Sequence, residues 1–267
     1  MKRIRKPRAA LACVVTALVL LTVITFLGLA FNEAAAVTDF TAKNLPPSAA
    51  HPFGTDWMGR DMLFRSLAGL SLSVRIGLIT ASCSALIALL LGCAAAIGKK
   101  ADAMVSWFTD LIMGIPHLLL LILISFACGR GFFGVTLGIV LTHWMPLSRV
   151  IRGEVRQLKQ SVYILAARKL GVSGTAIVKN HMLPHLYPQF TAGLVLLFPH
   201  AILHEASMTF LGFGLPLDEA SIGMILSESM GYLSTGSWWL AVFPGAMLVL
   251  TVLLFDLMGS TLKKLIF

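Results

Sequence analysis

The chain has 267 residues, of which 57% are hydrophobic and 12% are charged. So few charges cannot solvate the surface of a globular domain, which excludes an ordinary water-soluble protein and makes membrane lipid the expected solvent. The formal net charge of +9 would suit nucleic-acid binding, but the distribution of the basic residues favours membrane topology and no nucleic-acid partner.

Six apolar stretches approach or exceed the roughly 20 residues of helix that cross a hydrocarbon core. In chain order they are residues 9–31, 74–98, 105–128, 133–148 (the shortest), 186–210 and 238–259. Their length suits helices rather than the alternating ten-residue strands of a barrel. We therefore predict an all-α polytopic membrane protein of about six transmembrane helices. Gly134 and Gly138 form a GxxxG pair, a weak signal of close helix packing.

The first span follows a basic leader and could be a secretory signal cleaved near residues 34–36. Its apolar run of about 23 residues exceeds the roughly 7 to 15 of a signal h-region, so we predict an uncleaved anchor. The expected organisation is an anchor helix with an extracytoplasmic segment over residues 1–73, and a transmembrane core over residues 74–267.

The extracytoplasmic segment contains HPFGTDWMGRD, in which Gly54 and Gly59 mark a turn. The amphipathic stretch Met62–Val74 that follows is predicted to lie on the membrane surface and lead into the second helix. A second outer segment, residues 212–237, carries Asp218, Glu219 and Glu228. It could line the mouth of a pathway or be an ordinary loop.

The basic residues gather on one side of the predicted topology. If the N-terminus is cytoplasmic, the inner segments hold sixteen of the 21 Lys and Arg residues, and the outer segments keep Lys43, Arg60, Arg65, Arg75 and Arg130. This positive-inside bias predicts that both termini are cytoplasmic.

The longest inner segment, residues 149–184, is polar but patterned. Ser161 is predicted to cap a helix that ends near Lys169, Gly171 to form its C-terminal turn, and Ser173 to cap a second helix running to Pro184. This hairpin carries an apolar ridge of Ile164, Leu165, Ala167 and Leu170. The ridge could contact another protein or pack beneath the chain's own helices.

The stretch YILAARKLGVSGTAIVKNHMLP, residues 163–184, resembles the cytoplasmic signature of ATP-binding-cassette importer permeases. The positions that match this signature are Ala166, Ala167, Gly171, His181, Leu183 and Pro184. Leu165 stands where the signature has a glutamate, which puts in doubt any charged contact made there.

Two further stretches, HPFGTDWMGRD and EASMTFLGFGL (residues 51–61 and 205–215), resemble the second permease subunit of dipeptide, oligopeptide and nickel importers. The resemblance implies the type I permease fold in the bacterial inner membrane. It also implies a heterodimer with a homologous permease, two ATP-binding subunits and an extracytoplasmic solute-binding protein. The ATPases would bind the hairpin at Leu165, Ala166, Ala167 and Gly171.

The resemblance places ATP and magnesium on the partner ATPases and no cofactor on this chain. The stretch GCAAAIGKK, residues 92–100, is a poor phosphate loop, because five residues separate its glycines and Lys100 replaces the Ser or Thr. A basic membrane flank is the better interpretation.

Three histidines lie in predicted spans, and ionisable residues inside a membrane usually face a partner or a pathway. His200, His204 and Met208 recur at i, i+4 and i+8 on one helical stripe, and His143 lies on another helix. Imidazole and thioether suit transition metals. We therefore predict a solute path lined by His143, His200, His204, Met208 and Glu205, with His200 and His204 as transient metal ligands; His117 is a weaker candidate.

The alternative is that each histidine satisfies a hydrogen bond and Met208 fills space. The resemblance favours nickel or a metal chelate as the solute, with peptides as the alternative. A membrane metallohydrolase is a third possibility, but the glutamate of HExxH is replaced by Ala201. A gradient-driven secondary transporter would be expected to show an internal repeat, and none is convincing.

Overall fold

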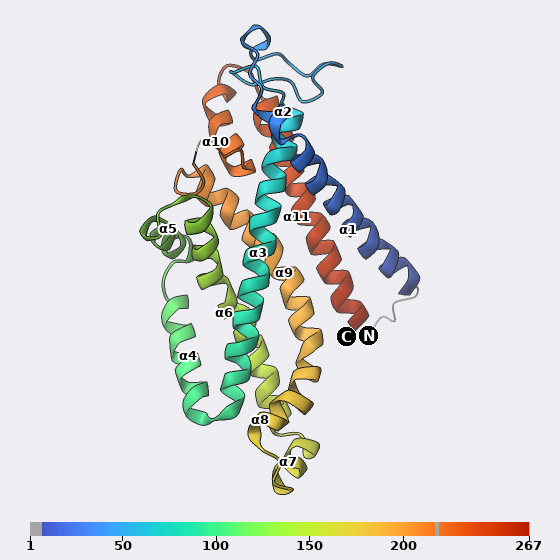
Figure 1. Ribbon diagram of the computed structural model, residues 1–267, viewed down its shortest axis with the longest axis vertical. Helices are drawn as coiled ribbons and strands as arrows, with labels where there is room; N and C mark the ends of the chain where they lie inside the picture. Colours follow the sequence, from blue (N-terminus) through green and yellow to red (C-terminus); the bar gives the residue numbers. More distant parts are fainter. Residues whose placement is uncertain (1–6, 217–218, 267) are drawn as a thin grey trace.

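The computed structural model describes residues 7–216 and 219–266. Over those residues it is an elongated bundle of helices without a β-strand, with one isolated bridge between Thr55 and Asp61 (Figure 1). The elements are α1 (Pro7–Ala30), α2 (Asn32–Ala36), η1 (Phe40–Ala42), α3 (Met62–Ile97), α4 (Lys99–Met113), α5 (His117–Ala127), α6 (Gly131–Lys159), α7 (Val162–Lys169), α8 (Gly174–Ile177), η2 (Val178–Met182), α9 (Leu183–Phe210), α10 (Ile222–Leu233) and α11 (Trp239–Ile266).

Among the residues that the structure describes, five helical stretches are long and apolar enough to cross a membrane, and a sixth crossing results if α4 and α5 form one span. The five are Ala10–Ala30, Met62–Ala95, Gly131–Lys159, Gly174–Phe210 and Trp239–Leu265. The predicted class, an all-α membrane protein of about six transmembrane helices, is confirmed.

The third predicted span is not one straight helix. It divides into α4 and α5, which meet at an angle of 94°. The break falls at Gly114–Pro116, where Pro116 has extended backbone (φ −54°, ψ 120°) and precedes the first residue of α5. Proline disfavours helical backbone at the residue before it and has no amide to donate, so the sequence Gly-Ile-Pro ends one helix and starts another.

The stretch Met62–Val74 was predicted to lie on the membrane surface, and this is wrong. These residues are the first turns of α3, which runs unbroken for 36 residues. The helix starts here because the Asp61 carboxylate accepts a hydrogen bond from the Leu63 amide (2.8 Å) and caps the first turn. The polar face of this stretch is covered by protein, since Arg65, Ser66 and Ser71 are all buried.

The second helix of the predicted inner hairpin also differs from expectation, because it does not stop at Pro184. The one-turn helix α8 continues through the π-helical turn η2 into α9. Pro184 lies in the first turn of α9, directly after the π-helical turn, where the regular hydrogen-bond pattern of the helix is already altered. The hairpin is thereby joined to a membrane helix without a break.

The helix α3 lies at the centre of the bundle and packs against α1, α6, α9, α10 and α11. Small residues allow the closest approaches: a Cβ on Gly92 would lie 2.4 Å from the Ile151 side chain, and one on Gly77 would lie 2.8 Å from Ile202. The anchor helix α1 contributes Ala17 and Leu21 to the main core, so it is packed as part of the bundle.

The helix α7 projects from one end of the bundle, and the segments α2, η1 and α10 lie at the other (Figure 1). The start of α1, the turn between α3 and α4 and the end of α11 point toward the α7 end. The basic residues predicted to be cytoplasmic gather there as well, apart from residues 1–6, which lie outside the described part of the chain. Asp218 lies outside it too.

Candidate functional site

The helix α7 begins and ends at the residues that the sequence predicts. Ser161 has extended backbone at its N-cap position, but the side-chain cap is absent, because the Ser161 hydroxyl donates to the Leu158 carbonyl (2.6 Å) and accepts no hydrogen bond from an amide of α7. Gly171 ends the helix in the left-handed region (φ +80°), which favours glycine. The Val172 amide donates to Ala167 and the Gly171 amide to Arg168, so the last carbonyls of α7 are satisfied.

The predicted apolar ridge of α7 divides between two surfaces. Ile164 is fully buried in the main core, and Ala167 is half-buried against that core. Leu165 and Ala166 are exposed, and Leu170 is 83% exposed. One face of the helix therefore fixes it to the bundle, and the other presents apolar side chains beyond the bundle's end.

The base of the hairpin is tied to the start of α4 by ion pairs. Asp102 pairs with Arg152 (Nη2 to Oδ1, 2.7 Å) and with Arg156 (Nη2 to Oδ2, 2.8 Å), both near the end of α6. One turn toward the N-terminus of α6, Arg149 pairs with Asp110 of α4. These ion pairs fix α4 against the last turns of α6, from which the hairpin extends.

The predicted path residues fall into two groups. His143, His200 and His204 line one pocket of about 430 Å³, which is formed where α5, α6 and α9 meet. Met208 and Glu205 are buried in the packing of α9 and do not line this pocket. Met208 packs with Ile76 and Ile139 in a second core cluster, so the i, i+4, i+8 stripe is not continuous along the pocket.

Glu205 has no basic partner within ion-pair distance among the described residues. Its side chain is fully buried, and Oε1 accepts a hydrogen bond from the Thr209 hydroxyl (3.0 Å). Its second carboxyl oxygen has no hydrogen-bond partner in the part of the chain that the structure describes. The predicted path residue therefore lies inside the α9 packing rather than in the histidine-lined pocket.

His117, which the sequence marked only as a weaker candidate for the path, has a larger place in the pocket than expected. It is the first residue of α5, directly after the break, and it lines the same pocket. The ring centroids of His117, His143 and His204 lie 4.6 to 5.0 Å apart. The proline before His117 was the available signal, because a helix that starts inside a membrane exposes its first side chains to whatever surrounds the break.

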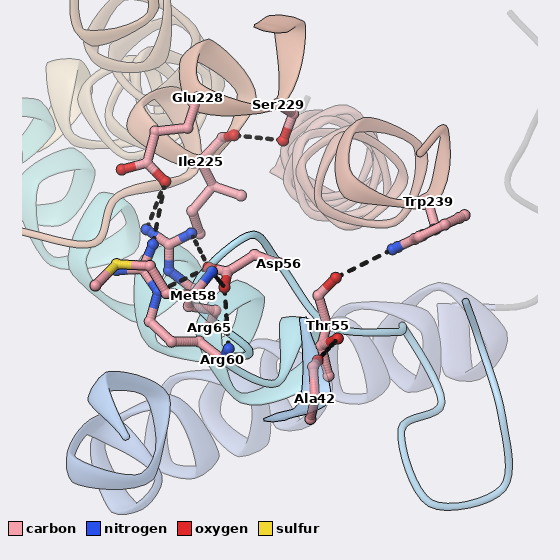
Figure 2. Close-up of polar contacts among 10 residues, drawn as sticks. All are labelled: Ala42, Thr55, Asp56, Met58, Arg60, Arg65, Ile225, Glu228, Ser229 and Trp239. Atoms are coloured by element: carbon pink, nitrogen blue, oxygen red, sulfur yellow. Dashed lines mark hydrogen bonds and ion pairs between the residues drawn. The ribbon is translucent and has the colours of Figure 1, made fainter. Parts of the chain in front are cut away.

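A second unpredicted feature is a buried ion network at the end opposite α7 (Figure 2). Asp56 accepts hydrogen bonds from the Met58 and Arg60 amides (2.8 and 2.9 Å), from Arg60 Nε (2.7 Å) and from Arg65 Nη1 (2.9 Å). Arg65 Nη2 also pairs with Glu228 of α10 (2.8 Å). The HPFGTDWMGRD loop is thus locked to α3 and α10.

The same loop is fixed by aromatic and backbone contacts. Trp239 Nε1 donates to the Thr55 carbonyl (3.3 Å), and the Thr55 hydroxyl donates to the Ala42 carbonyl (2.5 Å; Figure 2). Gly59 has φ +77°, and a Cβ there would lie 1.7 Å from the Asp39 carbonyl oxygen. The expected turn at Gly54 and Gly59 is therefore present and closely packed.

Comparison with known proteins gives a family match over residues 86–266, to the family described as "Binding-protein-dependent transport system inner membrane component". This range contains the hairpin, the histidine-lined pocket and α10.

Three curated relatives are similar over most of the chain. The "Dipeptide transport system permease protein DppC" of Bacillus subtilis is 32% identical over 84% of this chain and 70% of its own length. The "Probable D,D-dipeptide transport system permease protein DdpC" of Escherichia coli is 33% identical over 97% of this chain and 87% of its own. The "Oligopeptide transport system permease protein OppC" of Bacillus subtilis is 31% identical over 84% and 75%.

Proposed function

Because the chain belongs to the family of binding-protein-dependent transport system inner membrane components, it is a permease subunit of an ATP-binding-cassette importer, and we propose that it forms half of a translocation pathway for short peptides. It is a transport subunit and not an enzyme, which excludes the alternative that the chain is a membrane metallohydrolase. Membership of this importer family also implies partner ATPases and a solute-binding protein in general.

The proposed partners are a second, homologous permease, two ATP-binding subunits and an extracytoplasmic solute-binding protein. We place the chain in the bacterial inner membrane with both termini and α7 in the cytoplasm. The clustering of basic residues at the α7 end supports this orientation.

The observation that carries the proposal is the exposed apolar surface of α7. Val162 and Leu170 are each 83% exposed, and Leu165 and Ala166 lie between them in the sequence. Apolar side chains gathered at the end of a bundle, on a helix whose other face is fixed in the core, mark a protein contact. Leu165 in place of a glutamate makes this contact apolar, so we propose that an ATPase receives it in a hydrophobic groove.

Peptides are the solute that the relatives' names support, since those names specify dipeptides, D,D-dipeptides and oligopeptides. Nickel or a metal chelate is the second candidate. One observation favours it: of the four histidines that line the pocket, three bring their ring nitrogens within 4.8 Å of one another.

The test of coupling is uptake by the complete importer with Leu165→Asp and Leu170→Asp in this chain. Each charge would have to be desolvated on docking, so we expect the ATPases to be lost on purification and ATP-dependent uptake to fall at least about tenfold. Lys179→Ser, an exposed substitution in η2, is the matched control and should retain both. Full uptake with both aspartates present would refute the docking role of α7.

The solute is identified by the same cells, which are given labelled dipeptide and labelled nickel in separate assays. Peptide uptake that requires this chain supports the main proposal. Nickel uptake without peptide uptake would replace it with the second candidate.

A further inference from the structure

Three histidines from three different helices converge in the pocket. His117 begins α5, His143 lies near the middle of α6 and His204 lies in the last two turns of α9. Each ring offers one nitrogen such that all three nitrogens lie within 4.8 Å of one another. Residues so far apart in the sequence are brought together only by the packing of α5, α6 and α9.

The hydrogen bonds of His143 determine which of its nitrogens is free. Its Nδ1 lies 3.1 Å from the Ile139 carbonyl, which can only accept, so Nδ1 carries the hydrogen. The lone pair is therefore on Nε2, which is buried and has no hydrogen-bond partner among the described residues. A ring held by a backbone carbonyl on one nitrogen, with the other free, has the arrangement of a metal-ligating histidine.

The packing of α5 against α6 fixes His117 beside His143. A Cβ on Gly134 would lie 2.7 Å from the Ser125 carbonyl oxygen, and one on Gly138 would lie 3.3 Å from the Leu121 carbonyl oxygen. The two glycines thus allow the backbones of α5 and α6 to approach closely. The break at Pro116 then turns the chain so that α5 starts at the pocket.

We propose that His117, His143 and His204 form a binding site for a borderline divalent transition-metal ion such as nickel, cobalt or zinc. Three neutral imidazoles are a ligand set that these ions favour. Metal–nitrogen bonds of about 2.1 Å place tetrahedral ligand nitrogens roughly 3.4 Å apart. The half-buried rings of His117 and His204 reach that separation by side-chain rotation toward the fixed His143 ring.

The pocket holds such an ion weakly. None of the described residues that line it is acidic, so the protein supplies no charge to neutralise a dication in a low-dielectric setting. The balancing anion has to arrive with the ion, as a chelator or counter-ion. Weak binding suits a site from which an ion must be released. The inference rests on the proposed permease function and concerns its second candidate solute, a metal ion or its chelate, rather than peptides.

The test is equilibrium binding of nickel and cobalt to the purified chain in lipid nanodiscs, with an affinity tag that contains no histidine. Cobalt absorption reports the ligand geometry directly. We expect His117→Ala and His204→Gln each to weaken binding at least about tenfold, since loss of even an outer-shell partner costs 10- to 100-fold. His185→Ala, an exposed histidine in the first turn of α9 that does not line the pocket, is the matched control and should change affinity less than about twofold.

Equal losses in His185→Ala and His204→Gln, or no loss in either triad variant, would overturn the site. A monodisperse elution profile for each variant excludes misfolding as the cause of a loss. The assay uses no ATPase, so its outcome is independent of coupling. If uptake requires ATP but the chain binds no metal, the proposed metal site is refuted and the permease function stands. If the chain binds metal but the importer moves no solute, the metal site stands and the proposed transport function is refuted.

Discussion

Replacing Arg65 with methionine tests the ion network at the end opposite α7. Arg65 is 3% exposed and joins two carboxylates, Asp56 on the outer loop and Glu228 on α10. Methionine keeps much of the side-chain volume and removes the charge. After the change Glu228 keeps only Arg60, whose nearest nitrogen is 3.5 Å away.

The expected loss follows from the burial of the carboxylates. Breaking a buried ion pair by removing one partner costs about 3 to 5 kcal/mol. Asp56 retains Arg60 Nε and two backbone amides, so the lower figure applies. With an unfolding entropy of about 2.1 cal/mol/K per residue over the chain, about 3 kcal/mol lowers the melting temperature by about 5 °C.

The assay is thermal unfolding of the purified chain in detergent, followed by tryptophan fluorescence, because Trp239 donates to the same loop. Arg75→Met is the control: this arginine is exposed on the same helix and has no acidic partner within ion-pair distance among the described residues. Adding Glu228→Gln to Arg65→Met should cost less than the sum of the single changes, since the two residues interact. A melting temperature within 1 °C of the parent for Arg65→Met would refute the reasoning.

Two glycines give further predictions. Gly59→Ala should loosen the outer loop and speed its cleavage in limited proteolysis, because the new Cβ would lie 1.7 Å from the Asp39 carbonyl oxygen at a positive φ; an unchanged cleavage rate would contradict this. Gly134→Ala should push α5 away from α6 and weaken metal binding by the three histidines severalfold. Gly153→Ala is the control, because a Cβ at this position would have no atom within 4 Å; this variant should bind metal normally and melt at the same or a higher temperature. Equal metal binding by the two variants would rule out the packing argument.

The apolar spans and the α7 hairpin could be predicted because both depend on local signals. Hydrophobic length marks a membrane helix, and Ser161 and Gly171 mark the ends of α7 regardless of what packs around them. The start of α3 was missed for the opposite reason. An amphipathic stretch has the same pattern whether its polar face meets water or a buried network, and here the partner of Arg65 is Glu228, 163 residues later.

The histidine cluster was predicted only in part because helical periodicity relates residues on one helix. It correctly placed His200 and His204 on one side of α9, where both line the pocket. It extended the stripe to Met208, which the structure buries in the second core cluster. His117 joins the cluster through the bend between α4 and α5, and a bend changes which residues meet without changing the composition of either helix.

The positions of the three histidines connect the metal site to α7. The two helices that flank the hairpin, α6 and the continuous α8–η2–α9 segment, carry His143 and His204, while His117 lies on α5 beyond the bend. Shifts of packed helices by 1 to 2 Å are ordinary in conformational switching, and a shift of that size would move the triad nitrogens toward or away from bonding separation. A metal bound by all three histidines therefore favours one arrangement of α6 and α9 over others. Since a ligand shifts an equilibrium only through such differential affinity, a nucleotide that moves α7 would change metal affinity, and metal would change nucleotide affinity by the same factor.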